Sequence, residues 1–474
     1  MNDEPDRPQT RDKARIAILL GGEVLRDPRV SKVARTLAEQ GYSVAVFCLV
    51  AASSQLPARE THASGYTIYR RKVDEHAGML GTLRRWKQGL QQLRGGRASF
   101  SRMFTSVPRP HARTWAGGTT GLSSHRRPAR PTVPREDMLP WRALRWLQAG
   151  FNVALLVRAS WIIAWHARWW CADIIHANDL DMLGAGVLLR LCWRGALIYD
   201  AHELFADQSS TIRPTTRTWL IAWERLLIRH TTKVVTVGTC IATELARRYH
   251  VAMPVVVANC PPRSTLAQPV RDVPLGRPVR LVYQGIYDIE RGLEELVSAM
   301  CHVRGAELYL RGYGALEPTL KRIICENGLD DVVKLLPPVA PKDLVDALRE
   351  MDVGVGALQD KALNNRYCLP NKVFEYMAAG LALGLSDLPE LRNIVSTYET
   401  GVVFDQSDPR AIAAQLQRFV DDPAFLQRCR QNAWNAAQTV FNWELESRKL
   451  LSVYDDLAPL SAHSDAPQNV SGEL

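Results

Sequence analysis

The sequence lacks the cysteine patterns of a metal site or of a disulfide framework. Its 474 residues include nine cysteines, which are scattered and form no C-x-x-C pair. Structural zinc sites use closely spaced thiolate or imidazole ligands, and small secreted domains use paired cysteines. The scattered cysteines therefore favour a reducing compartment, and we expect a cytoplasmic protein.

Apolar residues are missing from the amino terminus, and no segment of 20 to 50 residues is repeated along the chain. Because no apolar core precedes Ile16, we expect no secretory signal. The length suffices for two or three domains, and the hydrophobic fraction of 46% is typical of a soluble globular protein.

Acidic residues are absent from His76 to Arg135, where twelve Lys and Arg residues give a charge of +12. The whole chain carries +10, so the rest is close to neutral. Residues 95–135 are rich in Gly, Pro, Ser, Thr and Arg without periodicity, which predicts a flexible basic insertion. Binding of an anionic partner is the alternative, but aromatic residues are too sparse for a nucleic-acid surface.

The segment that follows, residues 141–170, contains six of the thirteen tryptophans. Residues 146–165 have the length of about 20 that a bilayer span requires. A central Arg158 costs roughly 3 kcal/mol in a bilayer, which nearly cancels the apolar gain. We therefore expect a Trp-rich helix that does not span. It either packs on the first domain or lies at the headgroup level of an anionic membrane, on its cytoplasmic face.

Buried strands that alternate with amphipathic helices predict two Rossmann-like α/β domains. The first spans residues 14–260, and Gly22, after its first strand, would let a ligand approach the backbone. A Pro-rich linker at 261–278 leads to the second domain at 279–441. A helix at 442–457 and a disordered tail at 461–474 complete the chain.

Polar residues follow two predicted strands of the first domain, where open α/β sheets bind ligands. Asp179 and Asp181 follow the strand at 172–177, and we favour helix capping over metal binding for this pair. His202 follows the strand at 196–199 and either faces a ligand or bonds to nearby backbone.

One stretch of the second domain combines a carboxylate with strong helix signals. Pro370 is suited to the first turn of a helix, and Gly380 is suited to its left-handed end. Between them, Glu375 lies on a helix whose apolar face is occupied elsewhere, so it needs polar partners. An ion pair with a nearby Lys or Arg is the alternative to a ligand site.

This stretch resembles the donor-sugar site of the family 4 glycosyltransferases, which are retaining enzymes of the GT-B fold. The motifs Gly285…Arg291-Gly292, Gly312-x-Gly314 and Glu375…Gly380 follow in the family's order and spacing. The resemblance implies an α/β GT-B fold, with two Rossmann-like domains facing an interdomain cleft. It also implies that the first domain binds the acceptor, the second binds the donor, and the last helix returns to the first domain.

The resemblance also assigns roles to single residues. Glu375 would hold the ribose of a nucleotide sugar, Arg291 its diphosphate, and His202 would line the sugar pocket. Two positions depart from the family pattern, because Tyr367 replaces a Glu and Ile286 replaces an Arg. The residues expected at the site are the catalytic His202 and the donor-binding Gly22, Gly285, Arg291, Gly312, Gly314, Tyr367, Lys372 and Glu375.

The expected reaction is transfer of a hexosyl-type sugar from a nucleotide sugar to an acceptor hydroxyl with retention. The acceptor would be a glycan or a lipid-linked molecule in cell-surface polysaccharide or glycolipid synthesis. No metal and no cofactor are expected, because cations of the protein would stabilise the leaving diphosphate. The alternative is a non-catalytic nucleotide-sugar-binding or scaffolding protein of the same fold, which the two departures from the family pattern would suit.

Overall fold

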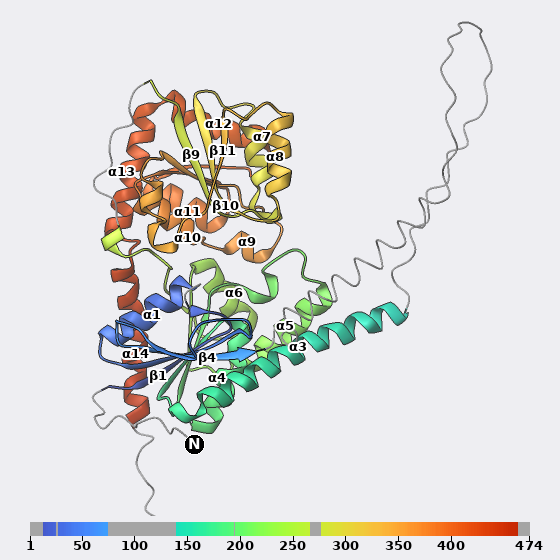
Figure 1. Ribbon diagram of the computed structural model, residues 1–474, viewed down its shortest axis with the longest axis vertical. Coiled ribbons are helices and arrows are strands. Elements are labelled where there is room, and N and C mark those ends of the chain that lie inside the picture. Colours follow the sequence, from blue (N-terminus) through green and yellow to red (C-terminus); the bar gives the residue numbers. More distant parts are fainter. Residues whose placement is uncertain (1–12, 25–26, 74–138, 194, 266–275, 463–474) are drawn as a thin grey trace, which may run out of the picture.

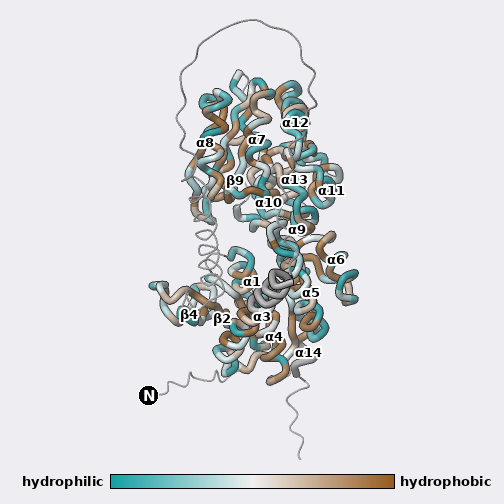
Figure 2. The backbone as a smooth tube through the Cα atoms, turned by 90° about the vertical axis from the view of Figure 1, so that its right-hand side faces the viewer, coloured by the Kyte–Doolittle hydropathy of each residue, from teal (hydrophilic) through white to brown (hydrophobic). Residues whose placement is uncertain are grey.

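Two α/β domains lie one above the other in the computed structural model (Figure 1). The structure describes residues 13–24, 27–73, 139–193, 195–265 and 276–462. The predicted insertion at 95–135, most of the predicted tail and residues 266–275 of the predicted linker lie outside these ranges. Figure 2, from a second direction, shows the same stacking, with α6 and α9 side by side at the domain boundary.

The first domain is built on an eight-stranded sheet of order β3-β4-β2-β1-β5-β6-β7-β8. Neighbouring strands are parallel except for the β3–β4 pair. Its strands are β1 (Arg15–Leu20), β2 (Ser43–Ala51), β3 (Arg59–Thr61), β4 (Thr67–Val73), β5 (Ile174–Asn178), β6 (Ala196–Ala201), β7 (Lys233–Thr236) and β8 (Val255–Val256).

Helices cover both faces of this sheet. They are α1 (Pro28–Glu39), α3 (Leu139–Ala167), α4 (Asp179–Trp193), α5 (Pro214–Ile228) and α6 (Thr239–Tyr249), with short 3-10 turns η2 (Arg168–Trp170), η3 (Phe205–Asp207) and η4 (Arg263–Thr265). The central strand β1 is apolar on both sides, as a parallel strand buried between two helical layers requires. Ala17 and Leu19 pack toward α3, α4 and α5, whereas Ile16 and Ile18 pack toward α1 and the last helix.

The second domain is a six-stranded parallel sheet of order β11-β10-β9-β12-β13-β14. Its strands are β9 (Val279–Ile286), β10 (Ala306–Tyr313), β11 (Val333–Leu336), β12 (Val353–Gly356), β13 (Ala382–Ser386) and β14 (Gly401–Phe404). Its helices and turns are η5 (Ile289–Arg291), α7 (Leu293–Ala299), α8 (Glu317–Glu326), η6 (Pro341–Asp343), η7 (Asp346–Leu348), α9 (Leu363–Tyr367), α10 (Asn371–Ala378), α11 (Pro389–Tyr398), α12 (Pro409–Asp421) and α13 (Pro423–Thr439).

The last helix, α14 (Trp443–Ala462), lies along the first domain (Figure 1). Leu450 and Tyr454 pack into the same core cluster as β1 and α1. At its start, the Trp443 indole donates to Thr36 Oγ1 at 2.9 Å, and Glu446 accepts from the Ala258 backbone at 2.8 Å. The helix extends to residue 462, so the tail predicted from residue 461 begins too early.

The Trp-rich segment forms α3 followed by the turn η2, and α3 packs on α4, α5 and β2. Leu156, Ile163 and Ala167 are buried on its inner side. Within the described ranges, no helix is long and apolar enough to cross a membrane.

We predict that Gly354→Ala destabilises the second domain by about 1–3 kcal/mol, because the new methyl group overpacks the core. An added Cβ at position 354 would lie 2.2 Å from the ring of Tyr376, which is on α10. The matched control in the same strand is Gly356→Ala, whose added Cβ has its nearest contact at 3.4 Å, on Leu385. In urea unfolding, the free energy of unfolding of Gly356→Ala should stay within about 0.5 kcal/mol of the wild-type value. Equal effects of the two substitutions would contradict the packing described here.

Candidate functional site

Glu375 stands on α10 with its side chain half-buried. Val373, Phe374 and Met377 are buried and commit the apolar face of the helix to the core. The Gln284 amide, from β9, donates to Glu375 Oε2 at 3.0 Å. Burial raises the pKa of Glu375, against the opposing effect of this hydrogen bond and of Lys372.

Lys372 lies one turn before Glu375, with its ammonium 3.8 Å from the centre of the Tyr283 ring. It shares a small pocket with Arg291, which ends η5. Burial and the Arg291 charge lower the pKa of Lys372 from 10.5 to about 7. Among the described residues, neither cation forms an ion pair. Two cations that lie close together without an anion favour an anionic ligand.

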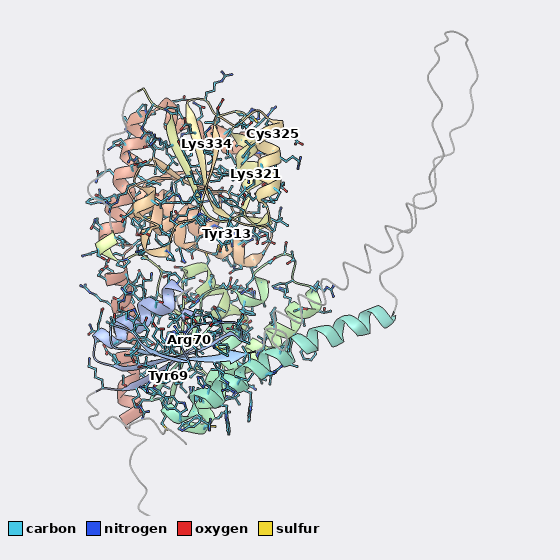
Figure 3. All side chains as sticks on the ribbon, viewed as in Figure 1. Tyr69, Arg70, Tyr313, Lys321, Cys325 and Lys334 are labelled. Atoms are coloured by element: carbon cyan, nitrogen blue, oxygen red, sulfur yellow. The ribbon has the colours of Figure 1, made fainter. Side chains whose placement is uncertain are left out.

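The ends of β9 and β10 are pressed together beside this pocket. Gly312 pairs with Gly285, and a Cβ added at Gly312 would lie 1.9 Å from the Gly285 carbonyl oxygen. Both residues have positive φ, +141° and +155° for Gly285 and Gly312, which favours glycine. Figure 3 shows Tyr313, between Gly312 and Gly314, at the end of the second domain that is nearest the first.

In the first domain, His202 lies between two carboxylates. Its Nδ1 is 3.2 Å from Asp179 Oδ2, and its Nε2 is 3.5 Å from Asp200 Oδ2. The His202 backbone N–H also donates to Asp179. Burial alone would lower the pKa of His202, but the two carboxylates raise it well above 6.5. The two carboxylates therefore favour the protonated form of the imidazole.

Asp200 is fully buried and is fixed by a chain of polar contacts. Arg29 donates to both of its carboxylate oxygens at 2.8 Å, a bidentate arrangement. His176 Nε2 lies 3.3 Å from Asp200, and its Nδ1 lies 2.5 Å from the Tyr454 hydroxyl. Burial would raise the pKa of Asp200, but Arg29 and His202 hold it well below its usual value. Arg29 and His202 therefore favour the ionised form of the Asp200 carboxyl group.

Further carboxyl groups lie near His202. Burial and the Asp179 charge raise the pKa of Glu203 to about 7, against the opposing effects of His202 and of Arg291 from the second domain. The Asn364 amide donates to Glu203 at 3.3 Å. Burial and Asp179 likewise raise the pKa of Asp181 to about 7. Glu203 thus links the two halves of the candidate site.

Lys32, on α1, brings a first-domain cation toward Glu375. Its ammonium donates to the Cys260 carbonyl at 2.6 Å and lies 4.8 Å from the Trp443 ring centre. Burial, together with the charge of Arg29, lowers the pKa of Lys32 to about 8, and the carboxylate of Glu375 opposes this shift.

Direct contacts also join the two domains. Glu290, next to Arg291, accepts hydrogen bonds from Ser209, Ser210 and Asn365. Glu390 accepts from the Cys240 backbone N–H, in the first turn of α6. Arg291 is therefore held next to an interdomain anchor.

Most of the predicted site residues come together. Gly285, Gly312 and Gly314 lie at neighbouring strand ends, and Arg291, Lys372 and Glu375 lie beside them. His202 lies in the first domain beside Glu203, and the charge of Arg291 acts to lower the pKa of Glu203. Their roles in binding and catalysis stay predictions.

One predicted residue lies outside this pocket, and another borders open space. Tyr367 packs on the core cluster of the first domain, so the structure does not bring its ring into the pocket of Arg291 and Lys372. Gly22 borders open space, since an added Cβ would meet nothing within 4 Å, and its role in ligand binding stays a prediction. The close approach is at Gly21, where an added Cβ would lie 1.9 Å from Asp181 Oδ2.

Asp179 does more than begin α4, since it binds His202 through both side-chain oxygens. The capping interpretation therefore misses its principal partner. In the part of the chain that the structure describes, no group of three or more His, Cys, Asp or Glu side chains is arranged to hold a metal ion.

Sequence reasoning missed Gln284, Glu203 and Lys32 as members of the site. Gln284 directly precedes Gly285, and Glu203 directly follows His202, so their positions beside predicted site residues were the available signal. Lys32 carried no such signal, because it is 343 positions from Glu375 in the sequence.

The second domain matches a known family. Residues 278–422, from β9 to α12, match the family model described as Glycosyl transferases group 1. The fold of the whole chain is GT-B, as two parallel-sheet domains and the solved structures below show.

Curated relatives are similar over part or most of their length. The chain is 30% identical to a D-inositol 3-phosphate glycosyltransferase of Thermobispora bispora over 146 residues, which are 31% of this chain and 32% of that protein. It is 25% identical to the enzyme of that name from Corynebacterium efficiens over 63% of this chain and 75% of that protein. The first match thus spans about a third of the relative.

Solved structures share the fold over nearly the whole chain. Sucrose-phosphate synthase from Thermosynechococcus elongatus superposes with a TM-score of 0.67 at 20% identity, over 94% of this chain and 100% of that one. Anabaena HepE in complex with UDP-glucose superposes with a TM-score of 0.58 at 12% identity, over 94% of this chain and 100% of that one.

We predict that Lys372→Met stabilises the protein at low pH and weakens binding of a nucleoside diphosphate. The folded pKa of Lys372, about 7, lies below its ordinary value of 10.5. The unfolded chain therefore binds more protons between these pH values, so the lysine is most destabilising below pH 7 and its effect fades by pH 10.5. The stability gain of Lys372→Met should shrink over the same window.

Urea unfolding between about pH 6 and pH 10 measures the stability effect. Calorimetric titration should show that Lys372→Met binds a nucleoside diphosphate about tenfold or more weakly than the wild type. A charge-assisted contact contributes about 1.5–3 kcal/mol to such binding. Lys361→Met, at an exposed lysine, is the matched control. A variant that is less stable than the wild type at low pH would contradict the description of this pocket.

Proposed function

We propose that the protein is a retaining glycosyltransferase of family 4, which transfers a hexosyl-type sugar from a nucleotide sugar to an acceptor hydroxyl. The observation that carries the proposal is the pair of cations, Arg291 and Lys372, in one small pocket of the second domain. A diphosphate would neutralise both, and it is the part of a nucleotide sugar on which charge develops as the sugar leaves.

The groups around the pocket suit the rest of a nucleotide. Glu375 would accept hydrogen bonds from the ribose hydroxyls. Gln284 Oε1 is a second acceptor beside it, buried and without a partner in the described chain. Two neighbouring acceptors are what a pair of adjacent hydroxyl groups requires. The glycine-lined strand ends at Gly285, Gly312 and Gly314 would let the nucleotide approach the backbone.

His202 would act as a fixed cation that faces the transferred sugar or the donor phosphates. Asp179 and Asp200 raise its pKa and favour the protonated imidazole, so it would stabilise negative charge. Breaking the bond between the anomeric carbon and the diphosphate oxygen leaves the electron pair on the diphosphate. Arg291, Lys372 and His202 would share that charge without a metal ion or a cofactor.

The acceptor would be a glycan or a lipid-linked molecule, in the synthesis of a cell-surface polysaccharide or glycolipid on the cytoplasmic side of a membrane. One relative, 26% identical over 39% of this chain and 46% of its own length, is an amylovoran biosynthesis glycosyltransferase of Erwinia amylovora. The part of this relative in amylovoran biosynthesis supports a biosynthetic setting.

We predict that a set of nucleotide sugars, tested by thermal shift, contains one that stabilises the wild type. A ligand at 100 times its dissociation constant adds about 2.7 kcal/mol. Arg291→Ala and Glu375→Ala should each weaken this ligand about tenfold or more and reduce sugar transfer, because each removes a charged contact. The control is Arg366→Ala, since Arg366 is half-exposed and pairs with Asp360 at 2.8 Å.

A non-catalytic binding protein would bind the same nucleotide sugar but release no nucleoside diphosphate with any acceptor. Transfer or hydrolysis by the wild type, lost in Arg291→Ala and kept in Arg366→Ala, would exclude that alternative. Equal activity in all three variants would contradict the proposed site.

A further inference from the structure

The outer side of α3 carries a row of exposed apolar residues at helical spacing. Val157, Trp161 and Trp165 are 42%, 61% and 59% exposed, and each is four residues from the next, so they line one face. The opposite face packs on the first domain. Large aromatic side chains in such a row cost solvation free energy unless something covers them.

An open pocket of about 470 Å³ lies beside this row. Its lining consists of Arg71, Trp161, Ile162, Trp165, His166, Arg168 and Trp169. Arg71 comes from β4, and the Arg168 guanidinium lies 3.6 Å from the centre of the Trp165 ring. Trp169 packs edge-on against Tyr69, which Figure 3 labels on the first domain.

The charge of this surface has one sign. The sequence of α3 contains no Asp or Glu, and the pocket adds two guanidinium groups and no carboxylate. His166 Nε2 is buried at the pocket and has no hydrogen-bond partner within the described chain. The surface therefore combines tryptophan rings with groups that donate to an anion.

These features fit the boundary layer of an anionic membrane. Tryptophan is enriched at that level, because its ring is apolar and its N–H is polar. Guanidinium groups bind phosphate in a bidentate manner, and anionic headgroups attract basic surfaces. Trp161 and Trp165 are one turn apart, so both reach the same depth when α3 lies parallel to the membrane plane. In Figure 1 the carboxyl end of α3 lies at the end of the first domain away from the second.

We propose that this face of α3, with Val157, Trp161 and Trp165 and the pocket between Arg71 and Arg168, docks on an anionic phospholipid surface. The rings lie among the headgroups, and a lipid phosphate occupies the pocket. Docking is independent of the proposed transfer reaction, although it would bring a lipid-linked acceptor to the protein.

The test is flotation of the full chain with vesicles of phosphatidylcholine, with and without phosphatidylglycerol. Wild type should bind the phosphatidylglycerol vesicles, and salt should weaken the binding. Trp161→Ser/Trp165→Ser should lower the partition coefficient about tenfold or more, since interfacial binding scales with buried apolar area. Arg71→Gln/Arg168→Gln should lower the partition coefficient on vesicles that contain phosphatidylglycerol. The same variant should leave the partition coefficient on pure phosphatidylcholine vesicles nearly unchanged.

The matched control is Met253→Ser, which removes a 64% exposed apolar side chain beside β8, at the opposite edge of the sheet from β4. Every variant keeps the basic segment between His76 and Arg135. A loss of vesicle binding would therefore be caused by the substitutions in α3, η2 and β4. The thermal unfolding midpoints should all match that of the wild type, which excludes misfolding.

Three results would overturn the proposal. One is the absence of wild-type binding to phosphatidylglycerol vesicles. Another is a partition coefficient of the double tryptophan variant that equals that of the wild type. The third is a dimer, found by analytical ultracentrifugation, that dissociates in that variant while vesicle binding persists, which would assign the face to a second copy of the chain.

Discussion

A lysine and an arginine, Lys372 and Arg291, share one small pocket of the second domain, and their mutual repulsion is the constraint on the residues around them. Lys372 and Arg291 repel each other, and the pKa of Lys372 falls to about 7 as a result of burial and of this repulsion. Tyr283 covers the lysine with its ring face, which compensates only part of the cost. Such a pocket is less stable alone than with an anion bound, which is typical of a binding site and not of a core.

The fold brings these charges together through short elements that allow little adjustment. Lys372 and Glu375 are fixed by α10, whose buried face is set by Val373, Phe374 and Met377. Beside them, Gly285 at the end of β9 leaves no Cβ where Lys372 approaches, since an added Cβ there would lie 3.2 Å from Lys372 Nζ. The positions of Lys372 and Glu375 are therefore fixed by packing before any ligand binds.

The first domain contributes His202, whose surroundings depend on contacts that reach the far end of the chain. His202 is held by Asp200, Asp200 by Arg29, and His176 connects Asp200 to Tyr454 on α14. The final helix thus supports both the first-domain core and the charge state of His202. Glu203 and Glu290 then connect this region to Arg291 and to the loop before α7.

Local pattern was enough to predict much of this arrangement. The alternation of buried strands and helices predicted the two α/β domains, and the fold is confirmed as GT-B. The helix around Glu375 was predicted from Pro370 and Gly380, which mark its two ends, whereas the role of Glu375 in a donor site came from the family resemblance.

Contacts between distant segments were not predictable in this way. Tyr367 occupies the expected position in the sequence, yet its ring packs on the first domain, since α9 lies at the domain boundary. Lys32 approaches Glu375 only because the domains face each other. For α3, composition left packing and membrane contact as alternatives, and the structure shows an inner face that packs and an outer face that is exposed.

The most direct test of the central claim is a crystal structure of the protein with the nucleoside diphosphate that stabilises it most. The account predicts density for the diphosphate between Arg291 and Lys372, and for the ribose hydroxyls at Glu375 and Gln284. Density for the nucleotide at any other place, with the two cations still without an anion, would contradict it.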